Sequence, residues 1–380
     1  MRIGIDARTV CTRRGIGNVV FHLLRGLSHI PDDFTCVIYV DDPGAHELVP
    51  VDSRFSVKIL RPKFYPVWEQ VGLPLSVVHD QLDILHCPGN SAPVFLPRSV
   101  KLVLSIMDVM YLFPASKLPK SPALYQRIGR EYLKQIVPIV ARRAAAIITI
   151  SATSRDDILL YLDVPKNRVS VGWLAANEAW RTIPEVSQLN LVRTKYDLNC
   201  PFVLALGAVD PRKNTAMIIQ AHAKFRRQFT GPFKLAVIGL PANGIGAFRG
   251  LAERLGIGEE VIFAGFVSEN DLVAIYHLAD LLLYPSLYEG FGLPVLEAMT
   301  CGTPVITSHS GSIPEIAGDA AVMVNPRDVD EIVAAMMRVT TDSVLRENLV
   351  AKGKMRAEAF SWQRTAEKTF EIYKNVMDGK

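Results

Sequence analysis

A regular alternation of short apolar runs with longer segments of helical periodicity constrains the fold of this chain most. The apolar runs predict strands at Arg2–Ala7, Thr35–Val40, Ser56–Leu60, Asp83–Cys87, Lys101–Ile106, Ala146–Ile150, Phe202–Leu206, Lys234–Ile238, Val261–Ala264, Leu281–Tyr284, Pro304–Thr307 and Ala321–Val324. Helical patterns between them include Asn18–His29, Thr215–Phe229, Asp271–His277 and Ser343–Phe360. Because strands that are apolar throughout must be covered on both faces, the pattern predicts parallel sheets between layers of helices.

The strand–helix pattern runs twice along the 380 residues, which is long for a single domain. It is interrupted at Trp173–Pro201, where we predict the linker between two domains. The predicted fold class is therefore α/β, with two Rossmann-like domains facing each other across a cleft. In doubly wound sheets of this kind, ligands bind at the carboxyl ends of the strands.

Composition and charge exclude several classes of protein. The net charge of +4 is small and no nucleic-acid-binding motif is present, so we expect no nucleic-acid partner. No apolar run approaches the roughly 20 residues that span a bilayer, and the amino terminus lacks a secretory signal. The five cysteines form no CxxC pair, which argues against a disulfide framework or a zinc site and predicts a cytoplasmic protein.

The segment from Tyr284 to Ile306 carries the most informative motif, YPSLYEGFGLPVLEAMTCGTPVI. A buried strand ends there in a loop with two glycines, and Pro294 then opens a helix. Gly290 and Gly292 allow the backbone to approach a ligand closely. The N–H groups at the start of the helix, near Gly292 and Leu293, predict a phosphate-binding site.

Two carboxylates, Glu289 and Glu297, flank this predicted phosphate site. A carboxylate accepts hydrogen bonds from hydroxyl groups, so ribose or sugar hydroxyls are the expected partners. The alternative is that Glu297 only stabilises the first turn of its helix and that Glu289 is solvated. For either residue alone the two interpretations are about equal, but the adjacent glycines and proline favour ligand binding.

A second motif, LALGAVDPRKN, places Arg212 and Lys213 after a predicted strand and a turn at Gly207. Two adjacent cations at this position suit a diphosphate leaving group, which gains negative charge as its bond breaks. The alternative is an ordinary solvated basic pair. The run at Val261–Ser268 is a candidate wall for a nucleotide base.

Near the amino terminus, Gly15 and Gly17 lie in a loop that leads into a helix and could admit a phosphate or a sugar. The chain has no GxGxxG motif after its first strand and no GxxxxGK[ST] motif. A dinucleotide-dependent dehydrogenase and a P-loop kinase are therefore not expected.

At these motifs the sequence resembles the retaining glycosyltransferases of family 4, which have the GT-B fold. The resemblance rests on EGFGLPxxE from Glu289, GxxDPRKN from Gly207, FxGxVSxxDL from Phe263, and GSIPEI from Gly311. The last helix, around Phe360–Tyr373, resembles the closing helix that returns to the N-terminal domain in this family. The resemblance thus implies an N-terminal acceptor-side domain of residues 1–175 and 361–380 and a donor-binding domain of residues 176–360.

The resemblance also implies roles for individual residues. Arg212 and Lys213 would bind the donor diphosphate, Glu289 the sugar and Glu297 the ribose, while Phe266 and Val267 would meet the base. The expected catalytic residues are Glu289, Arg212, Lys213 and Asp108. The expected donor-binding residues are Gly15, Gly17, Gly207, Phe266, Val267, Gly290, Phe291, Gly292, Leu293 and Glu297. No metal and no cofactor beyond a UDP- or GDP-linked sugar is implied.

The sequence departs from the family at Met107, where relatives commonly have a histidine before the aspartate that is here Asp108. Methionine supplies apolar contact and no strong hydrogen bond, so contact with the donor sugar is altered at this point. His86 at the end of another strand is either a partial replacement or a structural histidine. Because of this departure, a nucleotide-binding scaffold without catalytic activity is an alternative interpretation of the protein.

The expected reaction is the retaining transfer of a hexose, glucose or mannose, to a saccharide or lipid-diphosphate-linked acceptor, as in surface polysaccharide synthesis. A nucleotide-sugar epimerase with the same architecture is the alternative enzyme. Residues 117–143 carry seven Lys and Arg and one acid, and apolar residues recur there at helical spacing. This segment predicts either contact with the inner face of a membrane or a helix packed on the sheet, and Pro138 predicts an interruption of that helix.

Overall fold

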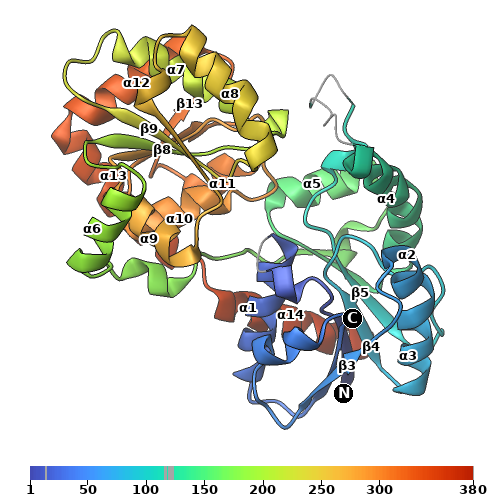
Figure 1. Ribbon diagram of the computed structural model, residues 1–380. Helices are drawn as coiled ribbons and strands as arrows, with labels where there is room; N and C mark the ends of the chain where they lie inside the picture. The colour runs from blue at the N-terminus through green and yellow to red at the C-terminus, as the bar shows by residue number, and fades with distance from the viewer. Residues whose placement is uncertain (13–14, 115–117, 119–123, 380) are drawn as a thin grey trace. The chain divides into compact units, whose positions relative to one another are not determined.

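The computed structural model describes residues 1–12, 15–114, 118 and 124–379 of the chain (Figure 1). Its internal contacts divide the chain into two compact units. Unit 1 comprises Met1–Phe113, the described part of Pro122–Leu174, and the C-terminal segment from Ser361. Unit 2 comprises Ala175–Phe360 with the described part of Pro114–Ser121.

Unit 1 is built on a parallel sheet of seven strands in the order β3-β2-β1-β4-β5-β6-β7. The strands are β1 (Arg2–Asp6), β2 (Thr35–Val40), β3 (Phe55–Ile59), β4 (Ile84–Cys87), β5 (Lys101–Ser105), β6 (Ala146–Thr149) and β7 (Val169–Val171). Every neighbouring pair is parallel, and the register puts Ile5 beside both Ile38 and His86. β7 was not predicted.

Helices cover both faces of this sheet (Figure 1). The α-helices of unit 1 are α1 (Ile16–Ser28), α2 (Tyr65–Val67), α3 (Leu73–His79), α4 (Leu124–Arg143), α5 (Ala152–Tyr161) and α14 (Trp362–Met377). Short 3₁₀ or π turns are η1 (Val10–Thr12), η2 (Pro43–Leu48), η3 (Trp68–Gly72), η4 (Met110–Leu112) and η5 (Lys166–Arg168). α1 and α14 lie together on one side of the sheet, and α2, α3 and α4 lie on the other.

The C-terminal helix α14 packs closely on α1 within unit 1. A Cβ atom placed on Gly26 of α1 would lie 2.4 Å from the Cβ of Ala366 in α14, so the two backbones approach as closely as they do only because Gly26 has no side chain. The imidazole of His22 stacks on the indole of Trp362 with ring centroids 4.5 Å apart. These contacts fix the last helix of the chain against the first.

Unit 2 has a parallel sheet of six strands in the order β10-β9-β8-β11-β12-β13. The strands are β8 (Phe202–Leu206), β9 (Lys234–Ile238), β10 (Val261–Gly265), β11 (Leu281–Tyr284), β12 (Val305–Ser308) and β13 (Val322–Val324). The α-helices are α6 (Val186–Lys195), α7 (Thr215–Arg226), α8 (Ala242–Arg254), α9 (Glu269–Leu278), α10 (Leu293–Cys301), α11 (Ile313–Ala317), α12 (Val329–Thr341) and α13 (Ser343–Glu358). The 3₁₀ turns are η6 (Glu178–Arg181), η7 (Pro211–Lys213) and η8 (Gly258–Glu260). In Figure 1, α7, α8 and α12 cover one face and α9, α10 and α13 the other.

The predicted fold class of two parallel-sheet, Rossmann-like α/β units is confirmed. In both sheets the chain first builds strands outward on one side and then crosses to the other, so the strand order reverses between β1 and β4 and between β8 and β11. Ligands of doubly wound sheets bind at the carboxyl ends of the strands on either side of such a reversal. In unit 2 that position is occupied by the loops that follow β8 and β11.

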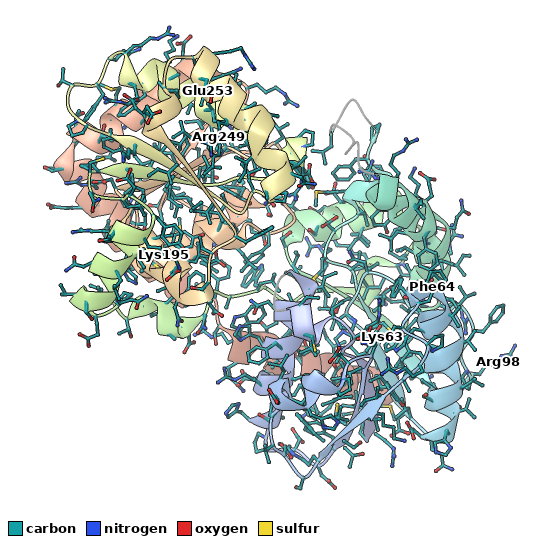
Figure 2. The ribbon with its side chains drawn as sticks, viewed as in Figure 1. Lys63, Phe64, Arg98, Lys195, Arg249 and Glu253 are labelled. Carbon is teal, nitrogen blue, oxygen red and sulfur yellow. The ribbon has the colours of Figure 1, made fainter. Side chains whose placement is uncertain are left out.

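The boundary between the units falls after Leu174, inside the predicted linker, but the predicted length of the linker and the predicted effect of Pro138 were wrong. Most of the predicted linker Trp173–Pro201 is folded in unit 2, where η6 and α6 lie, because Trp180 and Val192 are buried there. The Nζ of Lys195 lies 2.7 Å from Oδ2 of Asp271 and connects α6 to α9 (Figure 2). Pro138 does not interrupt α4, which continues through it.

None of the helices formed by the described residues is both long enough and apolar enough to cross a membrane.

The same substitution in two helices of unit 1 should change stability in opposite directions. Gly26→Ala should lower the free energy of unfolding by roughly 1–3 kcal/mol, because its Cβ would overlap Ala366 and push α14 away. Gly129→Ala in α4 should raise it by roughly 0.5–1 kcal/mol, because Gly129 is exposed, has open space around it and lies in a helix. Urea unfolding of the two variants measures both effects. Equal stability of the two variants would contradict the close packing of α1 on α14.

Candidate functional site

The loop between β11 and α10 is held in place by a second loop that precedes α11. The hydroxyl of Ser312 donates to the carbonyl oxygens of Glu289, at 3.0 Å, and Phe291, at 2.7 Å. Gly311 has φ 62°, and a Cβ on it would lie 2.5 Å from the carbonyl oxygen of Glu289. Gly311 therefore permits a contact between the two loops that any side chain would prevent, and this contact fixes the backbone of Glu289.

The carboxylate of Glu289 forms ion pairs with two cations and accepts a hydrogen bond from one hydroxyl. Its Oε2 lies 2.6 Å from Nη1 of Arg212, and its Oε1 lies 2.8 Å from Nζ of Lys213. The hydroxyl of Tyr284, at the end of β11, donates to Oε1 at 2.7 Å and also accepts from Nζ of Lys213. The predicted catalytic residues Arg212, Lys213 and Glu289 are therefore brought together, although about 76 residues separate the two segments.

Burial and charge act in opposite directions on this carboxylate. Only 6% of Glu289 is exposed, and burial by itself raises its pKa. The positive charges of Lys213 and Arg212 outweigh that effect and lower the pKa of Glu289 to about 2. Burial lowers the pKa of Lys213, and the charge of Glu289 opposes that change. Glu289 is thus a carboxylate at neutral pH, held between two cations.

Arg212 and Lys213 lie on the turn η7, which begins at Asp210. The side chain of Asp210 accepts from the backbone N–H of Arg212 at 2.9 Å and lies 3.6 Å from its Nε. Asn214 ends the turn with φ 59° and donates to the carbonyl oxygen of Pro285, 3.0 Å away. The loops that follow β8 and β11 are therefore joined, and both cations are fixed at the carboxyl ends of these two neighbouring strands.

The start of α10 adds backbone donors to the site. Gly292 precedes the helix with φ 106°, a conformation that favours glycine, and the helix has no side-chain cap at this end. Phe291 is buried and packs edge-on against the ring of Phe360, with ring centroids 5.9 Å apart. This contact anchors the loop between β11 and α10. A helix start without a cap is suited to hold an anion.

Glu297 occupies a different environment from Glu289. It lies in α10, is partly buried, and its Oε2 accepts from the hydroxyl of Tyr276 at 2.8 Å. Burial raises the pKa of Glu297 to about 7, since no cation stands as close to it as to Glu289. The two carboxylates proposed for the donor site therefore differ strongly in charge state near neutral pH.

The surroundings of three predicted ligand-binding glycines, Gly15, Gly17 and Gly207, differ from one another. A Cβ on Gly207 would lie 2.5 Å from Cγ1 of Val237, so this glycine makes room for the neighbouring strand. A Cβ on Gly17 would lie 2.2 Å from the carbonyl oxygen of Thr9. Gly15 has open space at its Cβ position and φ 51°. Of the three, Gly15 is the one with open space among the described residues.

The loop after β10 presents Phe266 to solvent, with 59% of this residue exposed, while Val267 is half-buried. Asp108, in unit 1, accepts from the backbone N–H of Met110 at 3.0 Å. Met107 is buried, and its backbone N–H donates to Oδ1 of Asn90 at 2.7 Å. Met107 therefore fills apolar space inside unit 1.

His86 is a structural histidine. It is 1% exposed, and both ring nitrogens have a partner: Nδ1 lies 2.6 Å from the hydroxyl of Tyr373, and Nε2 lies 2.7 Å from that of Ser105. Burial lowers the pKa of His86 to about 3. These contacts connect β4 to α14 and β5, and they argue against a replacement of the missing family histidine by His86.

Several polar residues that the structure brings forward have no motif of their own in the sequence. The hydroxyl of Tyr284 donates to Glu289, and that of Tyr276 donates to Glu297. Tyr284 ends the strand before the motif and Tyr276 lies near the end of α9, and these positions are the signal by which both could have been found. In unit 1, Glu69 is completely buried and accepts from Tyr65, at 2.6 Å, and from Ser91, at 2.5 Å. No motif surrounds Glu69, so nothing in the sequence indicated it.

Within the described parts of the chain, no group of three or more His, Cys, Asp or Glu side chains is arranged to hold a metal ion.

Comparison with known proteins connects this site to a family. Residues 192–356 match the family described as "Glycosyl transferases group 1". The O-antigen chain mannosyltransferase B of Escherichia coli is 33% identical over 281 residues, which cover 74% of this chain and 72% of that protein. The serotype-specific mannosyltransferase WbdA of Escherichia coli is 34% identical over 227 residues, 59% of this chain, and the match spans only 28% of WbdA.

Solved structures share the fold of the whole chain. Sucrose-phosphate synthase from Thermosynechococcus elongatus superposes with a TM-score of 0.77 over 100% of both chains, at 17% identity. HepE of Anabaena, solved in complex with UDP and glucose, gives a TM-score of 0.74 over 98% of this chain and 99% of that chain, at 15% identity. These likenesses, with the two Rossmann-like units, establish the GT-B fold. By its fold and by its similarity to the O-antigen mannosyltransferase, the chain belongs to the group 1 glycosyltransferases.

Proposed function

We propose that the protein is a retaining glycosyltransferase of family 4 that transfers a hexose from a UDP- or GDP-sugar to a saccharide or lipid-linked saccharide in surface polysaccharide synthesis. The observation that carries this proposal is the pair of cations, Arg212 and Lys213, fixed beside Glu289 at the carboxyl ends of β8 and β11. A sugar nucleotide presents a diphosphate, a ribose and a sugar, and the site offers groups of suitable chemistry for each.

The diphosphate is the leaving group and gains negative charge as the bond to the anomeric carbon breaks. Arg212 and Lys213, together with the N–H groups at the start of α10, would stabilise that charge. Because both cations are already held by Glu289 and by the turn η7, they need little reorganisation when the diphosphate binds. Retention would follow from attack on the face that the diphosphate leaves, with a donor phosphate oxygen taking the acceptor's proton.

The two carboxylates have separate proposed roles. Glu289 remains ionised and would accept hydrogen bonds from sugar hydroxyls while it orients Arg212 and Lys213. Glu297 has one carboxylate oxygen bonded to Tyr276 and would accept from the ribose with the other. Phe266 and Val267 would contact the base, and Phe266 is exposed enough to offer a ring face.

Relatives support the choice of sugar and acceptor. The two relatives described above are named as mannosyltransferases, one of them as an O-antigen chain mannosyltransferase, which favours mannose as the hexose. The structure of WaaG, which is described as a glycosyltransferase of lipopolysaccharide biosynthesis, has the same fold, with a TM-score of 0.72. A lipid-diphosphate-linked acceptor is therefore part of the proposal.

Peripheral membrane contact through 117–143 is also part of the proposal. Residues 117 and 119–123 lie outside the described residues, and the rest of the segment includes α4. Val137 and Val140 of α4 are completely buried against unit 1, whereas Ile128 is 64% exposed beside the exposed Arg127. One side of α4 is thus packed on unit 1, and among its described side chains Arg127, Ile128 and Ile139 are exposed and offer an apolar and basic surface to a membrane.

The first prediction concerns the leaving group. Arg212→Ala/Lys213→Ala should weaken binding of the nucleoside diphosphate by about 3 kcal/mol or more, since charge-assisted hydrogen bonds are worth roughly 1.5–3 kcal/mol each. Calorimetric titration with UDP and GDP measures this loss. The control is Arg227→Ala/Arg254→Ala, which removes two exposed cations from the same unit and should leave affinity unchanged. An unchanged affinity in the first variant would show that the diphosphate binds elsewhere.

The second prediction separates the two carboxylates. Glu297→Gln should weaken nucleotide binding through the lost ribose contact, by about 1 kcal/mol. Glu289→Gln should largely spare nucleotide binding and depress turnover, because the diphosphate can compensate the two cations that lose their partner. Glu253→Gln, an exposed acid of α8, is the matched control (Figure 2). Identical losses of nucleotide affinity in both site variants would refute the division of roles.

The third prediction tests the reaction itself. Incubation with radiolabelled UDP- and GDP-sugars should give label in a saccharide, or in lipid when a membrane lipid extract is added. If Met107 stands where relatives place a sugar-contacting histidine, Met107→His should be tolerated and should alter donor preference at most. Nucleotide binding without transfer to any acceptor would leave a binding scaffold, and inversion at C2 of the sugar would indicate an epimerase.

A further inference from the structure

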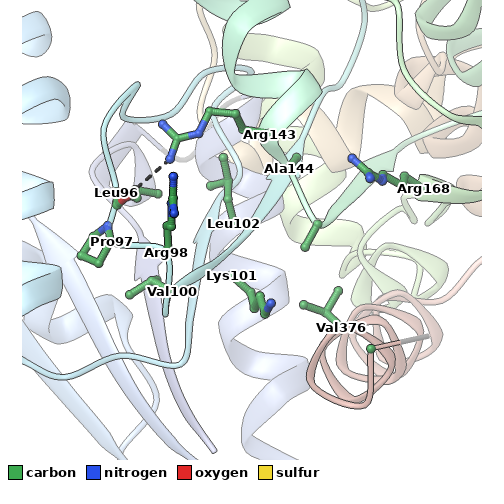
Figure 3. A pocket seen from close by; sticks show the side chains of 12 residues that line it. Leu96, Pro97, Arg98, Val100, Lys101, Leu102, Arg143, Ala144, Arg168 and Val376 are labelled. Carbon is green, nitrogen blue, oxygen red and sulfur yellow. Dashed lines mark hydrogen bonds between the residues drawn. The ribbon is translucent and has the colours of Figure 1, made fainter.

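Unit 1 contains a cavity of about 390 Å³ at the amino ends of β5, β6 and β7 (Figure 3). Lys101 begins β5, Ala145 precedes β6, and Arg168 precedes β7, and all three line the cavity. Val376 near the end of α14 contributes to the wall. The volume lies in the range of small-molecule binding sites, roughly 300–1,000 Å³.

Among the described residues that line this cavity, four are cations and none is acidic: Arg98, Lys101, Arg143 and Arg168. Across the part of the chain that the structure describes, none of these four side chains forms an ion pair with a carboxylate. Arg142, next to one of them, does have such a partner in Asp163, with Nε and Oδ2 3.7 Å apart. The positive charge of the cavity is therefore left uncompensated.

The protein itself holds two of these cations at the cavity. Nη2 of Arg143 donates to the carbonyl oxygen of Leu96 at 3.4 Å, and Nη1 of Arg168 donates to that of Arg142 at 3.3 Å. Figure 3 shows Arg98 and Arg143 on one side of the cavity and Arg168 on the other. Like charges held close together repel, and an anion between them removes the repulsion.

The composition of the cavity indicates the kind of anion. Three of the four cations are arginines, whose planar guanidinium groups bind phosphate through paired hydrogen bonds. Four positive charges exceed what a single carboxylate can neutralise and suit a group with several negative oxygens. Leu96, Leu102 and Val376 add apolar walls beside the charges. A ligand with a phosphoryl group joined to an apolar portion matches both features.

We propose that this cavity is a binding site for a phosphorylated ligand, separate from the donor site. It lies in unit 1, whereas Arg212, Lys213 and Glu289 lie in unit 2. It also lies at the amino ends of its strands, and the five residues of β5, at about 3.3 Å per residue, place it roughly 15 Å from the carboxyl edge of the same sheet. The phosphoryl group belongs either to a free phosphorylated molecule or to the headgroup of an anionic lipid.

Pyrophosphate is the probe for the first source. Calorimetry should show a class of sites whose affinity falls about tenfold or more in Arg98→Gln/Lys101→Gln, and also at high salt because exposed charges are screened. These two side chains make no hydrogen bond within the described structure, so the variant should fold. Hydrogen exchange should show that pyrophosphate protects residues 96–102 and 143–145 in the natural protein and not in this variant.

Two further variants make the result specific. Arg212→Ala/Lys213→Ala should keep the protection of residues 96–102, which separates this site from pyrophosphate bound at the donor site. Arg25→Gln/Arg254→Gln removes the same number of charges from exposed helix positions and should bind like the natural protein. Unchanged pyrophosphate affinity in Arg98→Gln/Lys101→Gln, or no protection of residues 96–102 in the natural protein, would overturn the proposal.

Vesicles distinguish the two sources of phosphate. Co-sedimentation with phosphatidylglycerol vesicles, but not with phosphatidylcholine vesicles, that falls at least tenfold in Arg98→Gln/Lys101→Gln assigns the site to a lipid headgroup. Vesicle binding that is absent or identical in both proteins, together with the loss of pyrophosphate binding, assigns it to a free phosphorylated molecule. Either result supports the site and names its ligand class.

Discussion

A parallel sheet must bury both of its faces, and this constraint governs both units of the protein. The inner strands of each sheet are buried and mostly apolar, and helices from the intervening segments cover them on each side. Because every strand runs in the same direction, all carboxyl ends meet at one edge of a sheet and all amino ends at the other. The core residues are buried between the sheet and its helices and cannot reach a ligand. The residues that bind ligands therefore lie in the loops at these two edges.

At the carboxyl edge of unit 2, a buried carboxylate organises the site. The charges of Lys213 and Arg212 outweigh the effect of burial and lower the pKa of Glu289, and the two cations are in turn positioned by it. The arrangement depends on Gly311, since any side chain there would strike the backbone of Glu289. Charge compensation and loop packing therefore fix the same group of atoms, and a diphosphate would enter a site that is already organised.

The amino edge of unit 1 shows the opposite electrostatic situation. Among the described residues its four cations have no carboxylate partner, whereas Arg212 and Lys213 of the proposed donor site are paired with Glu289. Compensated cations stay in place without a ligand, and uncompensated ones gain most from an external anion. A ligand at the carboxyl edge of unit 2 would therefore meet cations that are already oriented. A ligand at the amino edge of unit 1 would neutralise cations that have no described partner.

The sequence by itself determined the layered α/β fold and most strands, among them β2 and β8 to the residue, because buried parallel strands leave a continuous apolar pattern. It also identified Arg212, Lys213 and Glu289 as candidates, because local motifs carry their chemistry. It did not reveal that these three pair with one another, since the pairing joins segments distant along the chain. The tertiary structure alone decided that pairing and the packing role of glycines such as Gly207. It also decided the uncompensated charge of the basic cavity, because charge and close contact depend on neighbours in space that no local pattern encodes.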